Sequence, residues 1–195
     1  MLARENPFAV HRVLGIRYRM PEEHWAALDA RLAALGSRGA IVGPPGRGKT
    51  TLLEALSARW TARGLRVRAL GRPDGRRGLA AEQEALLASL SSGELVTLDS
   101  AEALSSGAWR RVLTATRAAA GFVIATHPPA RLPVLAEPET TPALLSDIVE
   151  QLAGPEVAAR LPPPGELFAR HGGNVRTALR ELYDYCAGMS ALSTA

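Results

Sequence analysis

An eight-residue stretch, Gly43–Thr50, constrains the fold more than any other part of the chain. Its sequence is Gly-Pro-Pro-Gly-Arg-Gly-Lys-Thr, which fits the pattern G-x-x-x-x-G-K-T. The apolar run Ala40–Val42 precedes it, and a helical pattern that includes Leu52, Leu56 and Trp60 follows it. A buried strand, a glycine-rich loop and a helix in this order predict a phosphate-binding loop.

The residue types of this loop suit a nucleotide phosphate. Glycines let consecutive backbone N–H groups turn toward one anion, and the following helix adds the positive end of its dipole. In such loops the lysine, here Lys49, reaches the β- and γ-phosphates, and the Thr50 hydroxyl binds Mg²⁺. The predicted nucleotide-binding residues are Gly43, Pro44, Pro45, Gly46, Arg47, Gly48, Lys49, Thr50 and Thr51.

The basic residues single out Lys49 a second time. The chain has 23 basic residues, and Lys49 is the only lysine among them. A compact ammonium is retained at the one position where arginine is a poor substitute. The same count disfavours a GTPase, because a base-reading Asn-Lys-x-Asp motif would need a second lysine.

Composition predicts a globular protein in a reducing compartment. The 195 residues, 47% of them hydrophobic, suit one domain with or without a small appendage. No apolar run reaches the length of a membrane span, and the N-terminal residues lack a signal sequence. Cys186 is the single cysteine, so no internal disulfide can form. We expect a cytoplasmic location and no membrane partner.

Positive charge is concentrated in the first part of the chain. Residues 1–77 carry 15 basic and 6 acidic side chains, whereas residues 78–195 carry 8 and 13. The densest region runs from Arg59 to Arg77 and contains Arg59, Arg63, Arg66, Arg68, Arg72, Arg76 and Arg77. Such a region can bind nucleic acid, or it can simply solvate a helix end and a loop. Both interpretations stay open.

Strands and helices are predicted to alternate through most of the chain. An irregular lead-in to Met20 is followed by a helix from Pro21 to Gly36. Strands are expected at 39–42, 65–70, 95–98 and 121–126, with a short fifth near 132–135, and helices at 49–62, 79–90 and after Ser105 or Ser106. This order predicts an α/β fold, a three-layer sandwich of the P-loop NTPase type with a mostly parallel sheet covered on both faces.

The last third of the chain is predicted to be helical. Helices are expected after Thr141, after Pro162–Pro164 and from Val175 onward. The expected organisation is a lead-in and helix (1–38), an α/β core (39–140), a small all-helical lid (141–187) and a flexible tail (188–195).

Polar residues follow the predicted strands. Asp99 ends an apolar strand about fifty residues after the phosphate loop, as a Mg²⁺-binding Walker B aspartate does, although a turn or helix-capping role would also suit it. Thr126 and His127 follow the next strand. Since the carboxyl ends of parallel strands meet at one edge, we expect these residues beside the loop.

With these parts in place, the sequence resembles the AAA+ ATPase superfamily. The wording of the loop is common in that superfamily, Thr126 lies where a sensor 1 residue would be, and Gly173-Asn174-Val175-Arg176 is similar to a sensor 2 segment. Asn6-Pro7-Phe8 and the small size are loosely similar to bacterial transposition-regulator and ExeA-like ATPases. The resemblance implies ATP and Mg²⁺ as cofactors and roles in ATP hydrolysis for Lys49, Asp99, Thr126 and Arg176. The alternative for Arg176 is a solvated helix residue.

The sequence departs from the superfamily pattern in two places. The glutamate that activates the attacking water normally follows the Walker B aspartate, but this position is Ser100. Glu102 is the nearest carboxylate and is either the replacement base or a surface residue. The second departure concerns the arginine finger, which a neighbouring subunit usually supplies. Arg131 is the first candidate for it, and Arg110 or Arg111 is the next.

The favoured function is a Mg²⁺-dependent ATPase that acts as a nucleotide-dependent switch or regulator, plausibly on DNA or a DNA-bound partner, with a protein partner or self-association. A small nucleotide or metabolite kinase is the first alternative, because Arg72, Arg76 and Arg77 could clamp a phosphate. An ATP-binding module that does not hydrolyse ATP is the second, because of Ser100.

Overall fold

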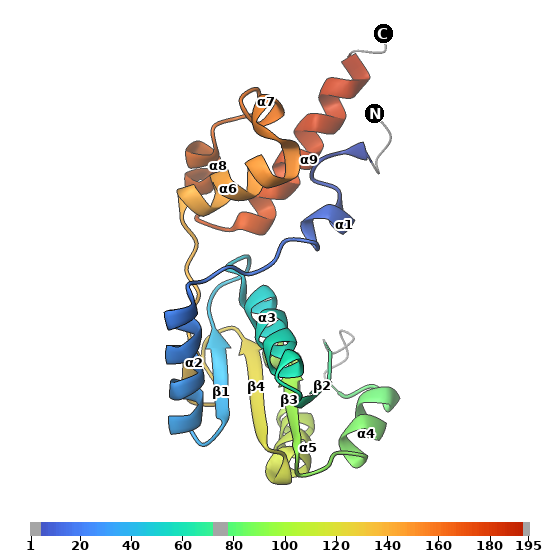
Figure 1. The fold of residues 1–195 in the computed structure, drawn as a ribbon. Coiled ribbons are helices and arrows are strands. Elements are labelled where there is room, and N and C mark those ends of the chain that lie inside the picture. Colours follow the sequence, from blue (N-terminus) through green and yellow to red (C-terminus); the bar gives the residue numbers. More distant parts are fainter. Residues whose placement is uncertain (1–4, 72–77, 193–195) are drawn as a thin grey trace. The chain divides into compact units, whose positions relative to one another are not determined.

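The computed structural model describes residues 5–71 and 78–192, which form two compact units. The α/β unit comprises residues 18–44 and 49–138, and the helical unit comprises residues up to 17, residues 45–48 and residues from 139 onward. The short segment 45–48 therefore belongs to the helical unit, although the residues before and after it belong to the α/β unit. Figure 1 shows the path of the chain through both units.

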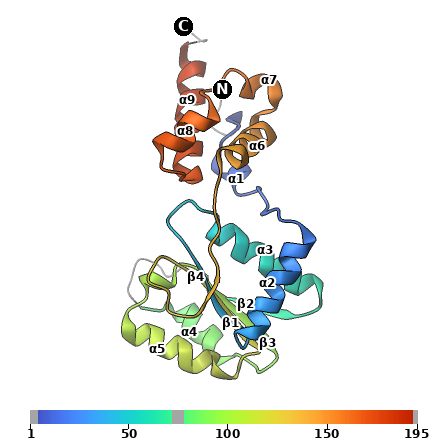
Figure 2. The ribbon, with the colours of Figure 1, turned by 90° about the vertical axis from the view of Figure 1, so that its left-hand side faces the viewer.

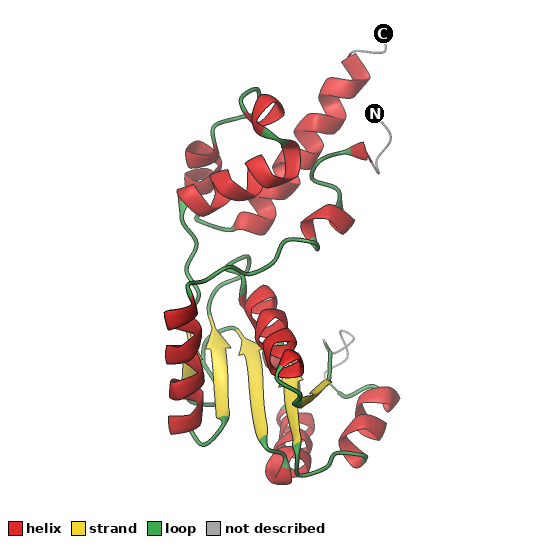
Figure 3. Cartoon of the chain, viewed as in Figure 1, coloured by secondary structure: helices red, strands yellow, loops and turns green. Residues whose placement is uncertain are grey.

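A five-stranded sheet forms the centre of the α/β unit (Figure 3). Its strands are β1 (Arg38–Val42), β2 (Arg66–Ala69), β3 (Glu94–Leu98), β4 (Gly121–Thr126) and β5 (Val134–Ala136). They lie in the order β2-β3-β4-β1-β5, and every neighbouring pair is parallel. All residues of β3 and β4 are buried, which is typical of a parallel sheet covered on both faces.

Helices cover both faces of this sheet (Figures 1 and 2). On one face, α2 (Glu22–Ala34) and α3 (Lys49–Ala62) form a core with Ile41, Val123 and Leu135. On the other, α4 (Ala81–Ala88) and α5 (Ser106–Ala115) form a core with Phe122 and Ile124. Neighbouring residues of each strand point to opposite faces, so one sheet serves two cores. The predicted three-layer α/β fold is confirmed.

Local signals explain where the helices of the α/β unit begin. α3 spans 49–62, as its periodicity predicts. Ser105 is the N-cap of α5, and its hydroxyl accepts a hydrogen bond from the Ala108 N–H at 3.3 Å. Pro21, expected as the first helical residue, instead precedes α2 as its N-cap. Two short 3₁₀ segments, Ala101–Ala103 and Thr116–Ala118, flank α5.

The helical unit contains α1 (Val10–Val13), α6 (Pro142–Ala153), α7 (Pro155–Ala158), α8 (Pro164–Arg170) and α9 (Val175–Leu192). Three of these helices begin with proline, which suits the first turn because its missing N–H would have no intrahelical partner. Their apolar faces form a separate core around the fully buried Leu145, Leu167 and Leu182.

The N-terminal lead-in is more ordered than its sequence predicts. Phe8 is 3% exposed and belongs to the core of the helical unit. Asn6 donates from Nδ2 to the Tyr183 carbonyl at 2.9 Å and accepts at Oδ1 from the Phe8 N–H at 3.0 Å. The segment therefore packs against the last helix of the chain.

The C-terminal helix is longer than expected. α9 continues to Leu192, so residues 188–192, predicted to lie in a tail, are helical. No proline interrupts this stretch, and alanine, methionine and leucine favour the helix. The last three residues of the predicted tail lie outside the described part of the chain. Across residues 5–71 and 78–192, no helix is both long and apolar enough to span a membrane.

Candidate functional site

The phosphate loop lies between the end of β1 and the start of α3, as the sequence predicts. Gly46 and Gly48 have φ angles of 73° and 80°, a left-handed conformation that side chains with a Cβ disfavour. Lys49 is the first residue of α3 and is buried, and its Nζ donates to the Pro44 carbonyl at 2.9 Å. The ammonium is therefore held over the loop rather than extended into solvent.

Thr50 and Asp99, the two predicted metal ligands, lie next to each other. The Thr50 Oγ1 donates a hydrogen bond to Asp99 Oδ2 at 3.1 Å. A hydroxyl and a carboxylate are the hard oxygen ligands that Mg²⁺ prefers, and Mg²⁺ commonly takes its other ligands from phosphates and water. No cluster of three or more His, Cys, Asp or Glu side chains that could hold a metal ion exists within the described residues. This pair of oxygens fits a Mg²⁺ ion bound together with a nucleotide.

The chain turns sharply after Asp99. Ser100 is buried and adopts φ 55°, a left-handed conformation that costs a non-glycine residue about 1–2 kcal/mol. Such residues cluster at functional sites. The turn leads into the short 3₁₀ segment that carries Glu102.

Glu102 is bound by the residue that follows the neighbouring strand. Its Oε2 accepts a hydrogen bond from the His127 N–H at 3.2 Å, and its Oε1 lies 3.5 Å from His127 Nδ1. Because β3 and β4 are adjacent in the sheet, this carboxylate lies at the carboxyl end of β4. Glu102 is thus not a freely solvated surface residue.

Thr126 lies at the same edge of the sheet. It is fully buried and pairs in register with Val42, the last residue before the phosphate loop. Its carbonyl accepts from the Gly43 N–H at 3.4 Å, and its Oγ1 donates to the His127 carbonyl at 3.0 Å. The structure therefore brings the start of the loop, Thr126 and His127 together.

Arg176 is the second residue of α9 in the helical unit. It is exposed, and no hydrogen bond or ion pair engages it within the described residues. The turn before it contains Gly172 and Gly173, both with positive φ, and Asn174, whose Oδ1 accepts from the Thr177 N–H at 3.2 Å. The predicted helix start is present, and the sensing role of Arg176 stays a prediction.

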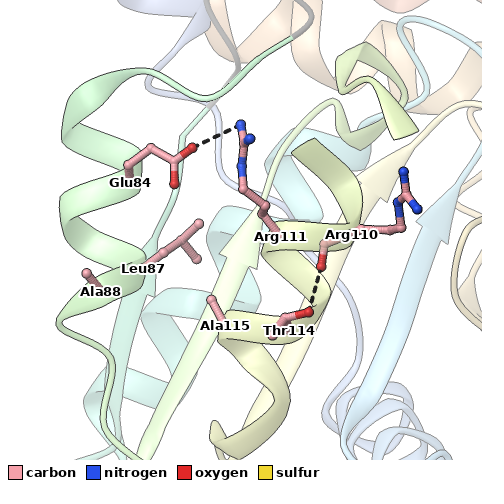
Figure 4. Close-up of a pocket in the computed structure, with 7 residues that line it drawn as sticks. All are labelled: Glu84, Leu87, Ala88, Arg110, Arg111, Thr114 and Ala115. Atoms are coloured by element: carbon pink, nitrogen blue, oxygen red, sulfur yellow. Dashed lines mark hydrogen bonds and ion pairs between the residues drawn. The ribbon is translucent and has the colours of Figure 1, made fainter. Parts of the chain in front are cut away.

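Two of the three candidate arginine fingers, Arg131 and Arg111, are engaged within the α/β unit. Arg131 lies over the Trp109 ring, 5.3 Å from its centroid, and donates to the Leu104 carbonyl at 2.9 Å. Arg111 pairs with Glu84 at 3.1 Å. Figure 4 shows this pair beside Arg110 in a pocket of about 430 Å³ between α4 and α5. None of the residues predicted to bind nucleotide or metal lines this pocket.

Most described arginines of the basic region are paired with carboxylates. Arg59 pairs with Glu22 and lies over the Trp25 ring, Arg63 pairs with Asp29 at 2.6 Å, and Arg68 with Glu94 at 3.3 Å. Arg72, Arg76 and Arg77 lie outside the described residues. Paired arginines present less net positive charge to nucleic acid, so the described part of this region gives that prediction little support.

Glu94 is the carboxylate with the clearest electrostatic perturbation. A hydrogen bond from the Ser91 N–H, 2.9 Å from Oε2, lowers the pKa of the Glu94 carboxyl, and Arg68 lowers it further. Burial acts in the opposite direction but is outweighed. This carboxylate lies at the start of β3, where it orders the turn before the strand.

The sheet topology and the loop after β1 define an α/β P-loop protein, the class that binds nucleotide phosphates at this position. The same fold occurs in solved structures that are similar to the chain at low sequence identity. Two variants of RuvB from Thermotoga maritima are similar to the chain, both at 19% identity and a TM-score of 0.56, over 90% and 89% of this chain. A DNA replication initiation factor is similar over 74% of this chain, at 19% identity and a TM-score of 0.52.

The chain spans less than two thirds of each of these structures, namely 64%, 63% and 57% of their lengths. No protein-family model matches the sequence, and no curated protein is significantly similar to it. At this level of identity the similarity establishes the fold, and the activity has to be argued from the residues.

Sequence reasoning missed two sets of contacts around the site. The binding of Glu102 by His127 depends on which strands are neighbours, and sequence order alone does not give that. The motif predicts Arg47 only as a nucleotide-binding residue of the loop. Its side chain in fact donates to Thr140 Oγ1 and to the Gly172 carbonyl, both at 2.8 Å. An arginine within an otherwise small-residue loop was the one available signal.

Proposed function

We propose that this protein is an ATP-binding, Mg²⁺-dependent ATPase of the AAA+ type that acts as a nucleotide-dependent switch. The observation that carries the proposal is the Thr50–Asp99 hydrogen bond, 3.1 Å long, directly after a loop with the residues of a phosphate site. A lone glycine-rich loop would need no carboxylate beside its final threonine.

In this proposal the loop and Lys49 bind the phosphates of ATP. The backbone N–H groups of residues 46–51, which include the start of α3, surround the phosphate oxygens, and Lys49 leaves the Pro44 carbonyl for the β- and γ-phosphates. Thr50 and Asp99 would hold Mg²⁺, which neutralises charge on the phosphates when bound. The buried position of Lys49 strengthens its attraction to an anion, because little water competes.

Glu102 is the proposed general base. Its carboxylate accepts the proton of the attacking water, and the His127 N–H holds one of its oxygens in place at the carboxyl end of β4. A base must be oriented as well as present, and two contacts to a single residue provide orientation. Thr126 and Arg176 are the proposed contacts to the γ-phosphate.

The partner in this proposal is DNA or a protein bound to DNA. Support comes from the similarity to a DNA replication initiation factor. Self-association is a second proposed response to nucleotide, because the resemblance to AAA+ ATPases implies an arginine finger that a neighbouring subunit supplies.

ATP binding and turnover test this proposal. Wild type, Lys49→Ala and Glu102→Gln are compared with and without double-stranded DNA, and Glu54→Gln, which removes an exposed carboxylate from α3, serves as the matched control. We expect Lys49→Ala to lose ATP binding, Glu102→Gln to bind ATP but lose turnover by about 10²–10⁴-fold, and Glu54→Gln to behave as wild type. Normal ATP binding by Lys49→Ala would refute the central claim.

An ATP-binding module without hydrolysis is the second candidate. Its support is Ser100 at the usual glutamate position, together with a Glu102 carboxylate already bound by His127. The same experiment separates the two candidates: a module binds ATP through Lys49 yet shows no turnover with DNA, with other proteins or at high protein concentration.

A further inference from the structure

Arg47 directs its side chain away from the phosphate-binding role of its backbone. Within the helical unit, which includes residues 45–48, its Nη1 donates to Thr140 Oγ1 and its Nη2 to the Gly172 carbonyl, both at 2.8 Å. Both terminal nitrogens of the guanidinium are thus engaged by neutral oxygens. Hydrogen bonds to a charged donor are among the stronger ones in proteins.

The two partners of Arg47 are connected to each other. Thr140 Oγ1 donates to the Gly173 carbonyl at 2.7 Å, so one hydroxyl accepts from Arg47 and donates to the turn between α8 and α9. A Cβ at Gly173 would lie 2.6 Å from Arg47 Nη1, so any other residue there would displace the guanidinium. The guanidinium therefore fits closely against this turn.

The residue before Arg47 is held by the same turn. The Gly46 carbonyl accepts from the Val175 N–H at 3.3 Å, in the first turn of α9. A Cβ at Gly46 would overlap the Asn174 side chain. Helix ends leave backbone groups without intrahelical partners, and here Gly46 and Arg47 bond to such groups at the start of α9 and after the end of α8.

We propose that Arg47 is a positioning residue for nucleotide binding, whose bonds to Thr140 and Gly172 hold the tip of the phosphate loop in one conformation. The inference rests on the proposed function and extends it to a residue whose side chain does not touch the phosphates. The backbone N–H groups of a phosphate loop bind only when they point at one anion. When a fraction of the molecules has the tip in another conformation, apparent affinity falls by that fraction.

A double-mutant cycle on MgATP affinity tests the proposal in the full chain. Arg47→Met removes both donors while retaining an unbranched apolar side chain, and Thr140→Val removes the hydroxyl while retaining the shape. We expect each to weaken MgATP binding by about tenfold, or about 1.4 kcal/mol, and the double variant to be no weaker than either single one. Thr140→Ser, which retains the hydroxyl, should restore binding. Arg180→Met, an exposed arginine of α9, is the control.

Hydrogen exchange of the nucleotide-free chain gives a second readout. Arg47→Met and Thr140→Val should both accelerate exchange of the Val175 amide, which is bonded to Gly46, whereas Arg180→Met should not. The inference would be overturned if Arg47→Met bound MgATP as tightly as wild type, or if the losses of affinity in the double variant were additive. Either result would leave the proposed function intact. Absence of Lys49-dependent MgATP binding in wild type would instead overturn the proposed function, and the positioning role with it.

Discussion

The N-terminal segment should be as important for the helical unit as any of its helices. Phe8 is 3% exposed and packs into a core with Leu145, Leu167 and Leu182. Truncating a buried phenylalanine to alanine costs about 3–5 kcal/mol, through lost apolar burial and the cavity that remains. Whole domains are stable by only about 5–15 kcal/mol. We therefore expect Phe8→Ala to remove a large share of the stability of this unit.

The chain provides separate probes for its two units. Its three tryptophans, Trp25, Trp60 and Trp109, all belong to the α/β unit, so their fluorescence follows the unfolding of that unit. Hydrogen exchange in α6, α8 and α9 follows the helical unit. Phe8→Ala should accelerate exchange throughout these three helices by at least 10²-fold, since each 1.4 kcal/mol is a factor of ten.

A control variant in the same segment makes this prediction sharp. Val10 lies two residues further on and is 74% exposed, so Val10→Ala should change stability by less than about 0.5 kcal/mol. Equal effects of the two substitutions would mean that the segment acts through its chain length or its helix rather than through Phe8. Unchanged exchange in Phe8→Ala would refute the packing argument itself.

Two further predictions concern a glycine and a carboxylate. Gly46→Ala should weaken MgATP binding and lower the melting temperature more than Gly64→Ala does, because both have positive φ but only a Cβ at residue 46 meets another side chain; equal effects would exclude the contact with Asn174. The lowered pKa of Glu94 gives stability that is present above its unfolded-state pKa of about 4.3 and is lost as pH falls through the lower folded-state pKa. Glu94→Gln should therefore be less stable than wild type at pH 7, with the difference shrinking toward pH 3 in urea titrations.

The α/β architecture could be predicted because its signals are local. The apolar runs at β1, β3 and β4 and the periodicity of α3 each depend on neighbouring residues only. Parallel order followed from the alternation of strands and helices, since parallel strands need a crossover connection. Even the weak fifth strand was located to within two residues.

The remaining contacts depend on tertiary proximity that no short pattern encodes. Asn6 and Tyr183 are separated by 177 positions, and Arg47 and Gly172 by 125. The lead-in is predicted to be irregular, yet an irregular backbone can still bury a phenylalanine. The charges counted along the basic region likewise did not reveal its ion pairs. Glu22 and Asp29, which pair with Arg59 and Arg63, come from a helix earlier in the chain.

In the proposed function, Glu102 takes the place of a missing motif residue through the order of the strands. In the usual pattern the carboxylate follows the Walker B aspartate directly, but here the left-handed conformation of Ser100 turns the chain and places the next carboxylate beside β4. That carboxylate contacts His127 after β4, and β4 lies next to β1, the strand that leads into the phosphate loop. What matters for a general base is its location at the sheet edge, and the order of the strands can supply that location without the motif. Glu102, rather than residue 100, is therefore the position at which we expect the base.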